Sequence, residues 1–206
     1  MSLHITFFHG WSYNADFFKD FSVSLEQSAD FFDRGYYYQP HIPILDQSKK
    51  NIAVTHSMGL FYILEHYDYH DFDKIIILSG FADFCADRSK DIVVNLKTAL
   101  EKNPQKALRR FSLMSGDKKR PIDDAAIDVS LLSDDLDILM ERNIYDALIP
   151  HQDKIYAVHG ASDSVIPHEN SHIPHIKNMI VADAGHVYSD QDNQKILGVI
   201  KSWIME

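Results

Sequence analysis

The sequence predicts an α/β protein in which a mostly parallel β-sheet is flanked by helices and interrupted by an inserted helical segment. Short apolar segments alternate with amphipathic helical patterns along most of the 206 residues, which is typical of parallel strands joined by crossover helices. Between Asp83 and about Asp146 the pattern is helical, with no strong strand. Reactive polar residues follow three of the apolar segments, as expected where parallel strands present ligands at one sheet edge.

The strands are predicted from short runs of β-branched, aromatic or aliphatic residues, most of them closed by glycine, proline or a polar residue. Continuous apolar runs indicate strands that are covered on both faces. The predicted strands occupy residues 5–8, 36–38, 51–55, 74–78, 154–158 and 179–182.

Helices are predicted where apolar residues recur every three or four positions, with Asn14 as the cap of the first. The predicted helices span about 14–28, 58–67, 92–100, 107–114, 131–140 and 191–203. The core is therefore expected to comprise residues 1–82 and 147–206, with 83–146 forming a helical lid over the carboxyl ends of the strands.

The composition excludes several classes of protein. A net charge of −10 argues against general nucleic-acid binding. Cys85 is the single cysteine, so no disulfide can form within the chain, which fits a reducing compartment. The sequence shows neither an apolar run of about 18 residues nor the pattern of a secretory signal at its start. We therefore expect a cytoplasmic protein with no membrane or nucleic-acid partner.

The segment Thr55-His56-Ser57-Met58-Gly59 joins a predicted strand to a predicted helix. A serine on such a sharp turn exposes its hydroxyl above the sheet, and a small residue two positions later lets the turn close. Thr55 stands where the G-x-S-x-G pattern has its first glycine, so the match is to S-x-G alone. An ordinary helix cap is the alternative interpretation of Ser57.

Two further predicted strands are followed by an acid and a base. Asp163 ends the segment HGASD, and His186 ends the segment DAGH. Separately, each could be a turn aspartate or a surface histidine. The order serine, aspartate, histidine, with each residue at a strand end, predicts a catalytic triad. His186 would take the proton of Ser57, and Asp163 would hold the imidazole.

An oxyanion hole is predicted beside the triad. His9-Gly10-Trp11 ends the first strand, and Gly10 permits close backbone approach. The backbone N–H groups of Trp11 and Met58 could both donate to a tetrahedral oxyanion, each with a value of about 3 kcal/mol. A simple strand-end turn is the alternative.

These motifs resemble the α/β-hydrolase superfamily along nearly the whole chain. Within it, HGW followed by NA at 9–15 is similar to the pimeloyl-acyl-carrier-protein methyl ester carboxylesterases of biotin synthesis, and QKALRRFSLM at 105–114 resembles their lid helix. The resemblance implies that Phe111 lines the acyl tunnel and that basic residues of this helix face the carrier protein. These basic residues are Lys106, Arg109 and Arg110. Thr55 and His56 depart from the glycine and tryptophan common in the family.

The charge distribution favours an acidic partner independently of that resemblance. Residues 83–120 contain ten basic and five acidic side chains, a balance of +5, so the remainder of the chain carries −15. A basic lid steers acidic partners such as acyl carrier protein, although exposed helix faces are often basic without a partner. Asp134, Asp135 and Asp137 are interpreted as a solvated acidic face.

The expected activity is that of a serine carboxylesterase acting on the methyl ester of pimeloyl-acyl carrier protein, with no cofactor. Hydrolysis of another small ester, a thioester or a C–C bond is the alternative, and a hydrolase-like binding protein without turnover is a third. His168, His172 and His175 lie close in sequence, but Pro174 interrupts a helix there and no cysteine or spaced carboxylate completes a metal set. No metal site is expected.

Overall fold

The computed structural model describes residues 2–23, 25, 27–87, 89–118, 120, 127–174, 178–188 and 190–206. Its centre is a six-stranded sheet in the order β2-β1-β3-β4-β5-β6, and every neighbouring pair is parallel. The strands are β1 (Leu3–Phe8), β2 (Ala29–Phe32), β3 (Lys50–His56), β4 (Lys74–Leu78), β5 (Ile155–Gly160) and β6 (Asn178–Ala182). The predicted fold class, a parallel sheet with flanking helices, is confirmed.

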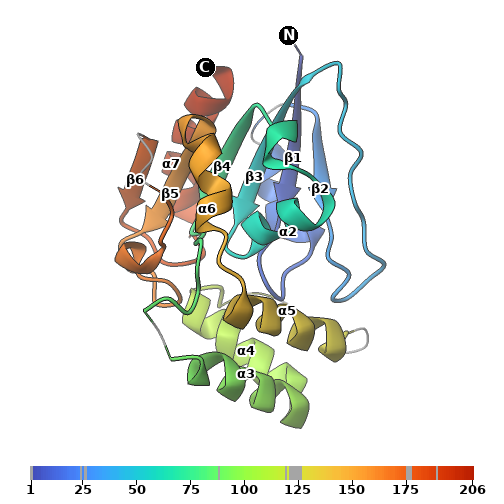
Figure 1. Ribbon diagram of the computed structural model, residues 1–206, viewed down its shortest axis with the longest axis vertical. Helices are drawn as coiled ribbons and strands as arrows, with labels where there is room; N and C mark the ends of the chain where they lie inside the picture. The colour runs from blue at the N-terminus through green and yellow to red at the C-terminus, as the bar shows by residue number, and fades with distance from the viewer. Residues whose placement is uncertain are drawn as a thin grey trace.

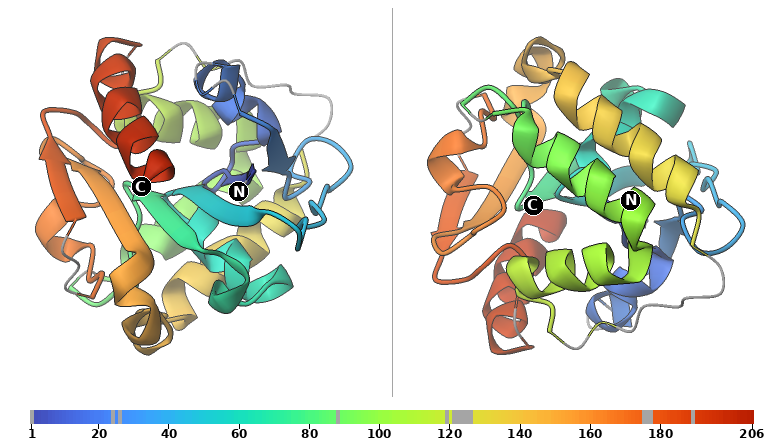
Figure 2. Two further views of the ribbon diagram at one scale, coloured as in Figure 1. Left: turned by 90° about the horizontal axis from the view of Figure 1, so that it is seen from above. Right: turned by 90° about the horizontal axis from the view of Figure 1, so that it is seen from below.

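Helices cover both faces of this sheet. The flanking α-helices are α1 (Lys19–Val23), α2 (Gly59–His66), α6 (Tyr145–Leu148) and α7 (Asp190–Met205). Short 3₁₀ turns occur at η1 (Ala15–Phe18), η2 (Tyr69–Asp71), η3 (Ile149–Lys154) and η4 (His168–Asn170). Seen from above, α1 and α7 lie on one side of the sheet and α2 and α6 on the other (Figure 2).

Alternation of side chains along the strands creates a core on each face. In β4, Ile75 and Ile77 belong to the core that includes α2, whereas Ile76 and Leu78 belong to the core that includes α7. Successive residues of a strand point to opposite faces, so a strand buried on both sides must be apolar throughout. This explains why the run Ile75–Leu78 predicts a strand so clearly.

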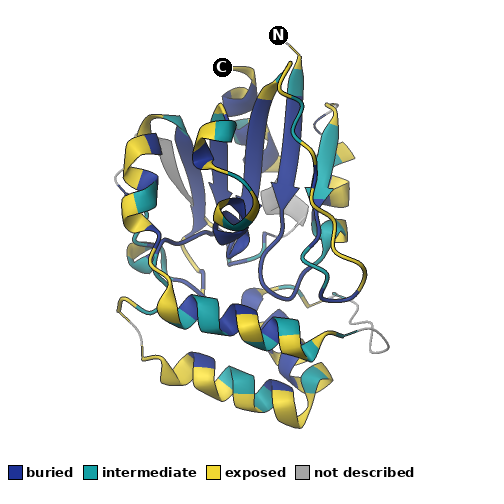
Figure 3. Ribbon diagram, turned by 45° about the vertical axis from the view of Figure 1, so that its right-hand side comes forward, coloured by how far each residue is buried: buried dark blue, intermediate teal, exposed yellow. Residues whose placement is uncertain are grey.

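Three further helices lie between β4 and β5 in sequence: α3 (Asp91–Lys102), α4 (Pro104–Ser115) and α5 (Val129–Glu141). They lie beneath the carboxyl ends of the strands, at the end of the molecule opposite both termini (Figure 1). Their exposed residues face away from the sheet (Figure 3). The chain enters and leaves this layer through a bridge between Asp83 and Asn143, supported by Ile144 N–H donating to Ala82 O at 2.9 Å.

The predicted strand at residues 36–38 is wrong. These tyrosines form a bend, and the edge strand β2 lies earlier, at Ala29–Phe32. Gly35, at φ 96°, turns the chain out of the extended conformation. Tyr36 is buried because it packs in the core, and its hydroxyl lies 2.5 Å from that of Tyr62. The aromatic run therefore reflects burial and not strand pairing.

The predicted solvated acidic face on α5 is also wrong for Asp135, which is fully buried. Arg34 donates to it through two nitrogens, at 2.6 and 3.0 Å, and Tyr36 and Tyr62 donate from their hydroxyls. Asp135 thus ties α5 to the sheet core. Among the described helices, none combines the length and apolarity needed to cross a bilayer.

Candidate active site

The turn between β3 and α2 holds Ser57 in a strained position. Ser57 has φ 53°, in the left-handed region that residues other than glycine rarely adopt. The turn packs so tightly that a Cβ on Gly59 would lie 2.2 Å from the carbonyl oxygen of Phe8. Thr55 is fully buried at the position where the pattern has glycine. The turn therefore forms with a threonine there, whereas Gly59 is required.

The structure brings Ser57, Asp163 and His186 together from three strand ends. His186 Nε2 lies 3.0 Å from Ser57 Oγ, and His186 Nδ1 lies 2.8 Å from Asp163 Oδ2. All three side chains are buried, and Ser57 is 7% exposed. With Nδ1–H donating to the carboxylate, Nε2 is left as the acceptor that faces the hydroxyl. This arrangement suits general-base activation of an alcohol.

Asp163 is held as a carboxylate by several donors. Its Oδ1 accepts the backbone N–H groups of Val165 and Ile166, each at 2.8 Å. Its Oδ2 lies 3.3 Å from His159 Nε2, in addition to its contact with His186. Burial raises the pKa of Asp163, but hydrogen bonds from His159 and His186 outweigh it and hold the pKa well below its usual value.

His56 supports the backbone of the loop that carries His186. Its Nε2 donates to the carbonyl oxygen of His186 at 3.0 Å. Burial, together with the nearby ring of His186, lowers the pKa of His56 to about 3, so the ring is neutral. Neither His56 nor His159 has a role that was predicted from the sequence. The available signal was their position, one residue before Ser57 and four residues before Asp163.

The loop after β1 approaches the nucleophile closely. A Cβ on Gly10 would lie 2.9 Å from His56 Nδ1 and 3.0 Å from Ser57 Cβ, so a larger residue cannot fit. Trp11 directly follows Gly10 and Met58 directly follows Ser57, so the two predicted oxyanion donors, the N–H groups of Trp11 and Met58, each adjoin a residue of this close contact in sequence. Neither of these two N–H groups donates to another backbone carbonyl within the described chain. Both remain candidates for the oxyanion hole.

The inserted helices contact this loop directly. The indole N–H of Trp11 donates to the carbonyl oxygen of Leu132 in α5 at 2.9 Å. Phe111 of α4 meets the Trp11 ring edge to face, with centroids 4.9 Å apart. Phe111 therefore lies against the candidate oxyanion loop, and both helices buttress the residue whose backbone would hold the oxyanion.

The carboxyl end of α4 contacts the loops that carry Asp163 and His186. Ser164 Oγ donates to the carbonyl oxygen of Met114 at 2.7 Å, and Val187 N–H donates to that of Ser115 at 2.9 Å. Ser164 and Val187 directly follow Asp163 and His186 in sequence. The position of α4 is therefore coupled to the acid and the base.

The basic residues of α4 lie on its outer side. Lys106, Arg109 and Arg110 are exposed, whereas Ala107 and Phe111 on the same helix are buried. None of the three cations forms an ion pair with a described residue. Their charge is therefore available to a partner in solution.

Two other basic residues of the segment are engaged within the protein. Arg120 donates to Ser12 Oγ at 3.0 Å and to the hydroxyl of Tyr37 at 2.7 Å. Lys97 pairs with Asp137 at 2.5 Å. The basic surface is thus narrower than the charge count of the sequence suggests.

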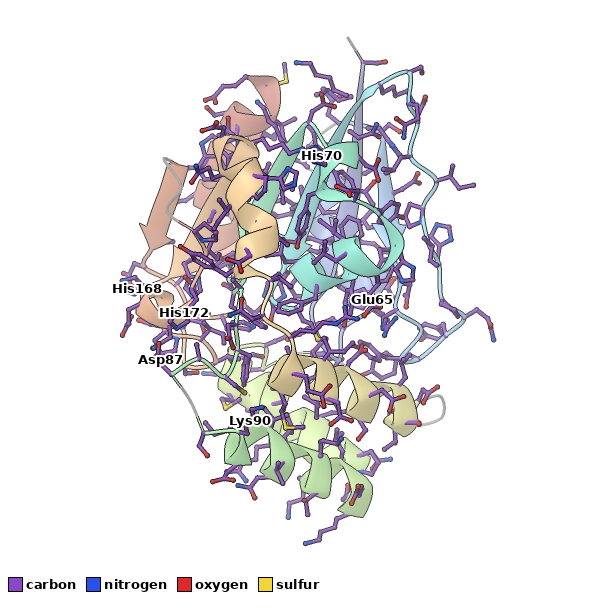
Figure 4. The ribbon with its side chains drawn as sticks, viewed as in Figure 1. Glu65, His70, Asp87, Lys90, His168 and His172 are labelled. Atoms are coloured by element: carbon purple, nitrogen blue, oxygen red, sulfur yellow. The ribbon has the colours of Figure 1, made fainter. Side chains whose placement is uncertain are left out.

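Two of the clustered histidines after β5 lie beside carboxylates. His168 Nδ1 lies 3.0 Å from Glu169 Oε2, and His172 Nε2 lies 2.5 Å from Asp87 Oδ2. His168, His172 and Asp87 lie together beside the β5–β6 edge (Figure 4). His175 lies outside the described residues.

The parallel sheet with its elbow, and the helices inserted after β4, define an α/β-hydrolase fold. Solved structures of hydrolases superpose on this fold. An esterase from Exiguobacterium antarcticum superposes with a TM-score of 0.78 at 16% identity, covering 100% of this chain and 92% of that one. An enol-lactonase from Burkholderia xenovorans gives 0.76 at 10% identity, covering 100% and 92%. An epoxide hydrolase from Bacillus megaterium gives 0.63 at 14% identity, covering 100% and 94%. The sequence matches no protein-family model and no curated protein.

Proposed function

We propose that the protein is a serine hydrolase that cleaves carboxylic esters through an acyl-enzyme on Ser57. The observation that carries the proposal is the continuous chain of contacts from Ser57 Oγ through the two ring nitrogens of His186 to Asp163, at 3.0 and 2.8 Å. An ionised acid, an oriented imidazole and a serine hydroxyl on a strained turn are the parts that nucleophilic acyl transfer requires.

In the proposed mechanism, Ser57 Oγ attacks the ester carbonyl carbon while His186 Nε2 takes the hydroxyl proton. The carbonyl oxygen becomes an oxyanion between the N–H groups of Trp11 and Met58. Collapse of this intermediate breaks the bond to the leaving alcohol, which receives the proton from His186. Water then attacks the carbonyl carbon of the acyl-enzyme while His186 takes its proton. The acid is released as His186 returns the proton to Ser57 Oγ.

The preferred substrate that we propose is the methyl ester of pimeloyl-acyl carrier protein, with methanol as the leaving alcohol. The unpaired cations Lys106, Arg109 and Arg110 support this choice because they offer a basic surface to a strongly acidic carrier. The buried face of the same helix supports it as well, since Phe111 lies against Trp11 at 4.9 Å, where an acyl chain would enter. The resemblance of residues 105–114 to the family's lid helix points the same way.

Labelling with a fluorophosphonate probe tests the nucleophile. Wild-type protein should be labelled and should hydrolyse p-nitrophenyl butyrate, whereas Ser57→Ala should do neither. Ser162→Ala is the matched control, because Ser162 is an exposed serine in the neighbouring acid loop. Equal labelling of wild type and Ser57→Ala would contradict the proposal, and a wild-type protein without labelling or turnover would favour a binding protein.

The substrate is tested by comparing carrier-bound and free methyl pimelate. The carrier-bound ester should be the better substrate, and the double variant Lys106→Glu, Arg110→Glu should lower its kcat/KM while leaving hydrolysis of the free ester unchanged. The double variant Lys195→Glu, Lys201→Glu makes an equivalent charge change at exposed positions on α7 and should have no effect. Indifference to the carrier and to charge reversal would leave a general esterase or thioesterase.

A further inference from the structure

A cluster of three metal-ligating side chains lies at the opposite end of the sheet from the candidate active site. Asp68 and His70 belong to the connection between α2 and β4, and His151 belongs to η3, which precedes β5. One ligand atom from each residue can be chosen so that all three lie within 4.8 Å of one another. Figure 4 places His70 at the end of the molecule remote from α3, α4 and α5.

The two imidazoles already face each other. The rings of His70 and His151 meet edge to face, with centroids 4.4 Å apart. The ring nitrogens of His70 and His151 make no hydrogen bond with another described side chain or carbonyl. They are therefore available to solvent or to a ligand. His70 is exposed, whereas His151 is 7% exposed, so the cluster opens on one side to solvent.

The carboxylate is positioned by the local backbone. Asp68 Oδ1 caps the turn η2 by accepting the N–H of His70 at 2.8 Å, while Asp68 N–H donates to Asp71 Oδ2 at 2.8 Å. This capping box fixes the carboxylate beside the imidazole of the residue two positions later. Asp68 Oδ2 remains for a cation, so its ligand role does not compete with the cap.

The charges around the cluster favour a cation. Residues 68–73 contain three aspartates and no lysine or arginine. The ammonium of Lys154 is the nearby opposing charge, and it is engaged by the carbonyl oxygens of Tyr69 and Phe72 at 2.7 and 2.6 Å. These two contacts also hold η2 against η3, so the three ligands come from segments that are already fixed to each other.

We propose that Asp68, His70 and His151 bind a divalent transition-metal ion of the zinc type. Two imidazoles and one carboxylate suit zinc, nickel or cobalt, with water completing the coordination, whereas magnesium prefers a set made of oxygen ligands. The site joins the segments that precede β4 and β5, the neighbouring strands between which the whole inserted layer lies in sequence. Its role is to stabilise the packing of η2 against η3 at the amino-terminal ends of β4 and β5, the end of the sheet opposite the inserted layer. The proposal departs from the expectation, drawn from the sequence, that the chain has no metal site.

The test is titration of the full-length chain with zinc chloride, followed by isothermal calorimetry in a buffer that does not bind zinc. Wild type should bind one equivalent, and His70→Gln and Asp68→Asn should each weaken binding by about tenfold or more. Asp68→Asn keeps the oxygen that caps η2, and His70 is exposed, so both variants should fold. The matched controls His168→Gln and His172→Gln remove two histidines that lie beside carboxylates elsewhere in the molecule, and they should leave the affinity unchanged.

Two independent measurements accompany the titration. Cobalt chloride should produce visible absorption bands in wild type and in His168→Gln, and these bands should be lost in His70→Gln. Zinc at about 100 times its Kd should raise the Tm of wild type by about 5 to 10 °C, with no rise from magnesium chloride. Absence of a stoichiometric zinc ion would overturn the proposal. Equal loss of affinity in His70→Gln and His168→Gln would also overturn it, because it would show adventitious binding to surface histidines only.

Discussion

The buried ion pair between Asp135 and Arg34 should be a principal support of the layer formed by α3, α4 and α5. Asp135 is fully buried, and the side chain of Arg34 is 17% exposed. Replacing Asp135 by asparagine keeps the volume and one carboxamide oxygen for Tyr36 and Tyr62. It also places an NH₂ group against the guanidinium, so a donor faces a donor and the arginine loses one of its two carboxylate partners.

The size of the stability loss depends on how many carboxylate contacts Arg34 keeps in the variant. Breaking a buried ion pair by removing one partner costs about 3–5 kcal/mol. Arg34 retains one carboxylate, since its Nη1 lies 3.0 Å from Oε2 of Glu65, which comes from α2 and is labelled in Figure 4. We therefore expect Asp135→Asn to lower the free energy of unfolding by about 3 kcal/mol, the lower end of that range, and Tm by about 6–12 °C.

Urea unfolding followed by circular dichroism measures this change. Asp134→Asn is the matched control, since Asp134 is an exposed neighbour on the same helix and its substitution should change stability by about 0.5 kcal/mol or less. A decrease of about 1 kcal/mol or less in the free energy of unfolding of Asp135→Asn would refute the reasoning, because removing a buried carboxylate that binds Arg34 through two nitrogens should destabilise the fold by more than this. Ester hydrolysis by the folded variant would then report whether α5 still supports Trp11.

Gly10→Ala should lower kcat/KM for p-nitrophenyl butyrate by about 100-fold or more, because the added Cβ would lie 2.9 Å from His56 Nδ1 and 3.0 Å from Ser57 Cβ and so displace the oxyanion loop; hydrolysis at the wild-type rate would contradict this. Asp163→Asn should lower kcat by about 10⁴-fold, since an amide does not favour the imidazole tautomer that accepts the proton, and stopped assays at high enzyme concentration can measure the residue of activity. Stability should decrease as the pH falls from about 7 to 5, because burial lowers the pKa of His9 to about 4 and that of His56 to about 3. Both rings are neutral when folded but gain protons near pH 6.5 when unfolded, which amounts to about 2 kcal/mol for each at pH 5; urea midpoints that do not change over this range would show that the rings are not buried as neutral groups.

The elements with a strong local pattern were predictable. The apolar runs that became β1, β3, β4, β5 and β6, and the periodic segments that became α3, α4 and α5, lie within a few residues of their predicted positions. Periodicity of 2.0 or 3.6 is a property of neighbouring residues, so it is visible without knowledge of the fold. The strand prediction at 36–38 failed because Tyr36 is buried by residues distant in sequence, notably Tyr62 and Asp135, and not by strand pairing.

The residues proposed for the candidate site could be predicted from the sequence, but the histidines that hold them in place could not. Reactive residues at the ends of parallel strands necessarily meet at one edge, so Ser57, Asp163 and His186 could be expected together. The roles of His56 and His159 depend on which ring nitrogen faces which carbonyl or carboxylate, at 3.0 and 3.3 Å. Motif spacing contains no such information.

The sequence by itself therefore determined most of the strands and helices, the candidate reactive residues and the basic residues on α4, since each depends on local pattern or on residue type. Only the tertiary structure decided that Asp135 is buried against Arg34 and that Trp11 is fastened to α5. It also decided that Asp68, His70 and His151 converge. The physical reason is that burial, hydrogen bonding and metal coordination depend on distances between residues far apart in the chain, which only the packed fold sets.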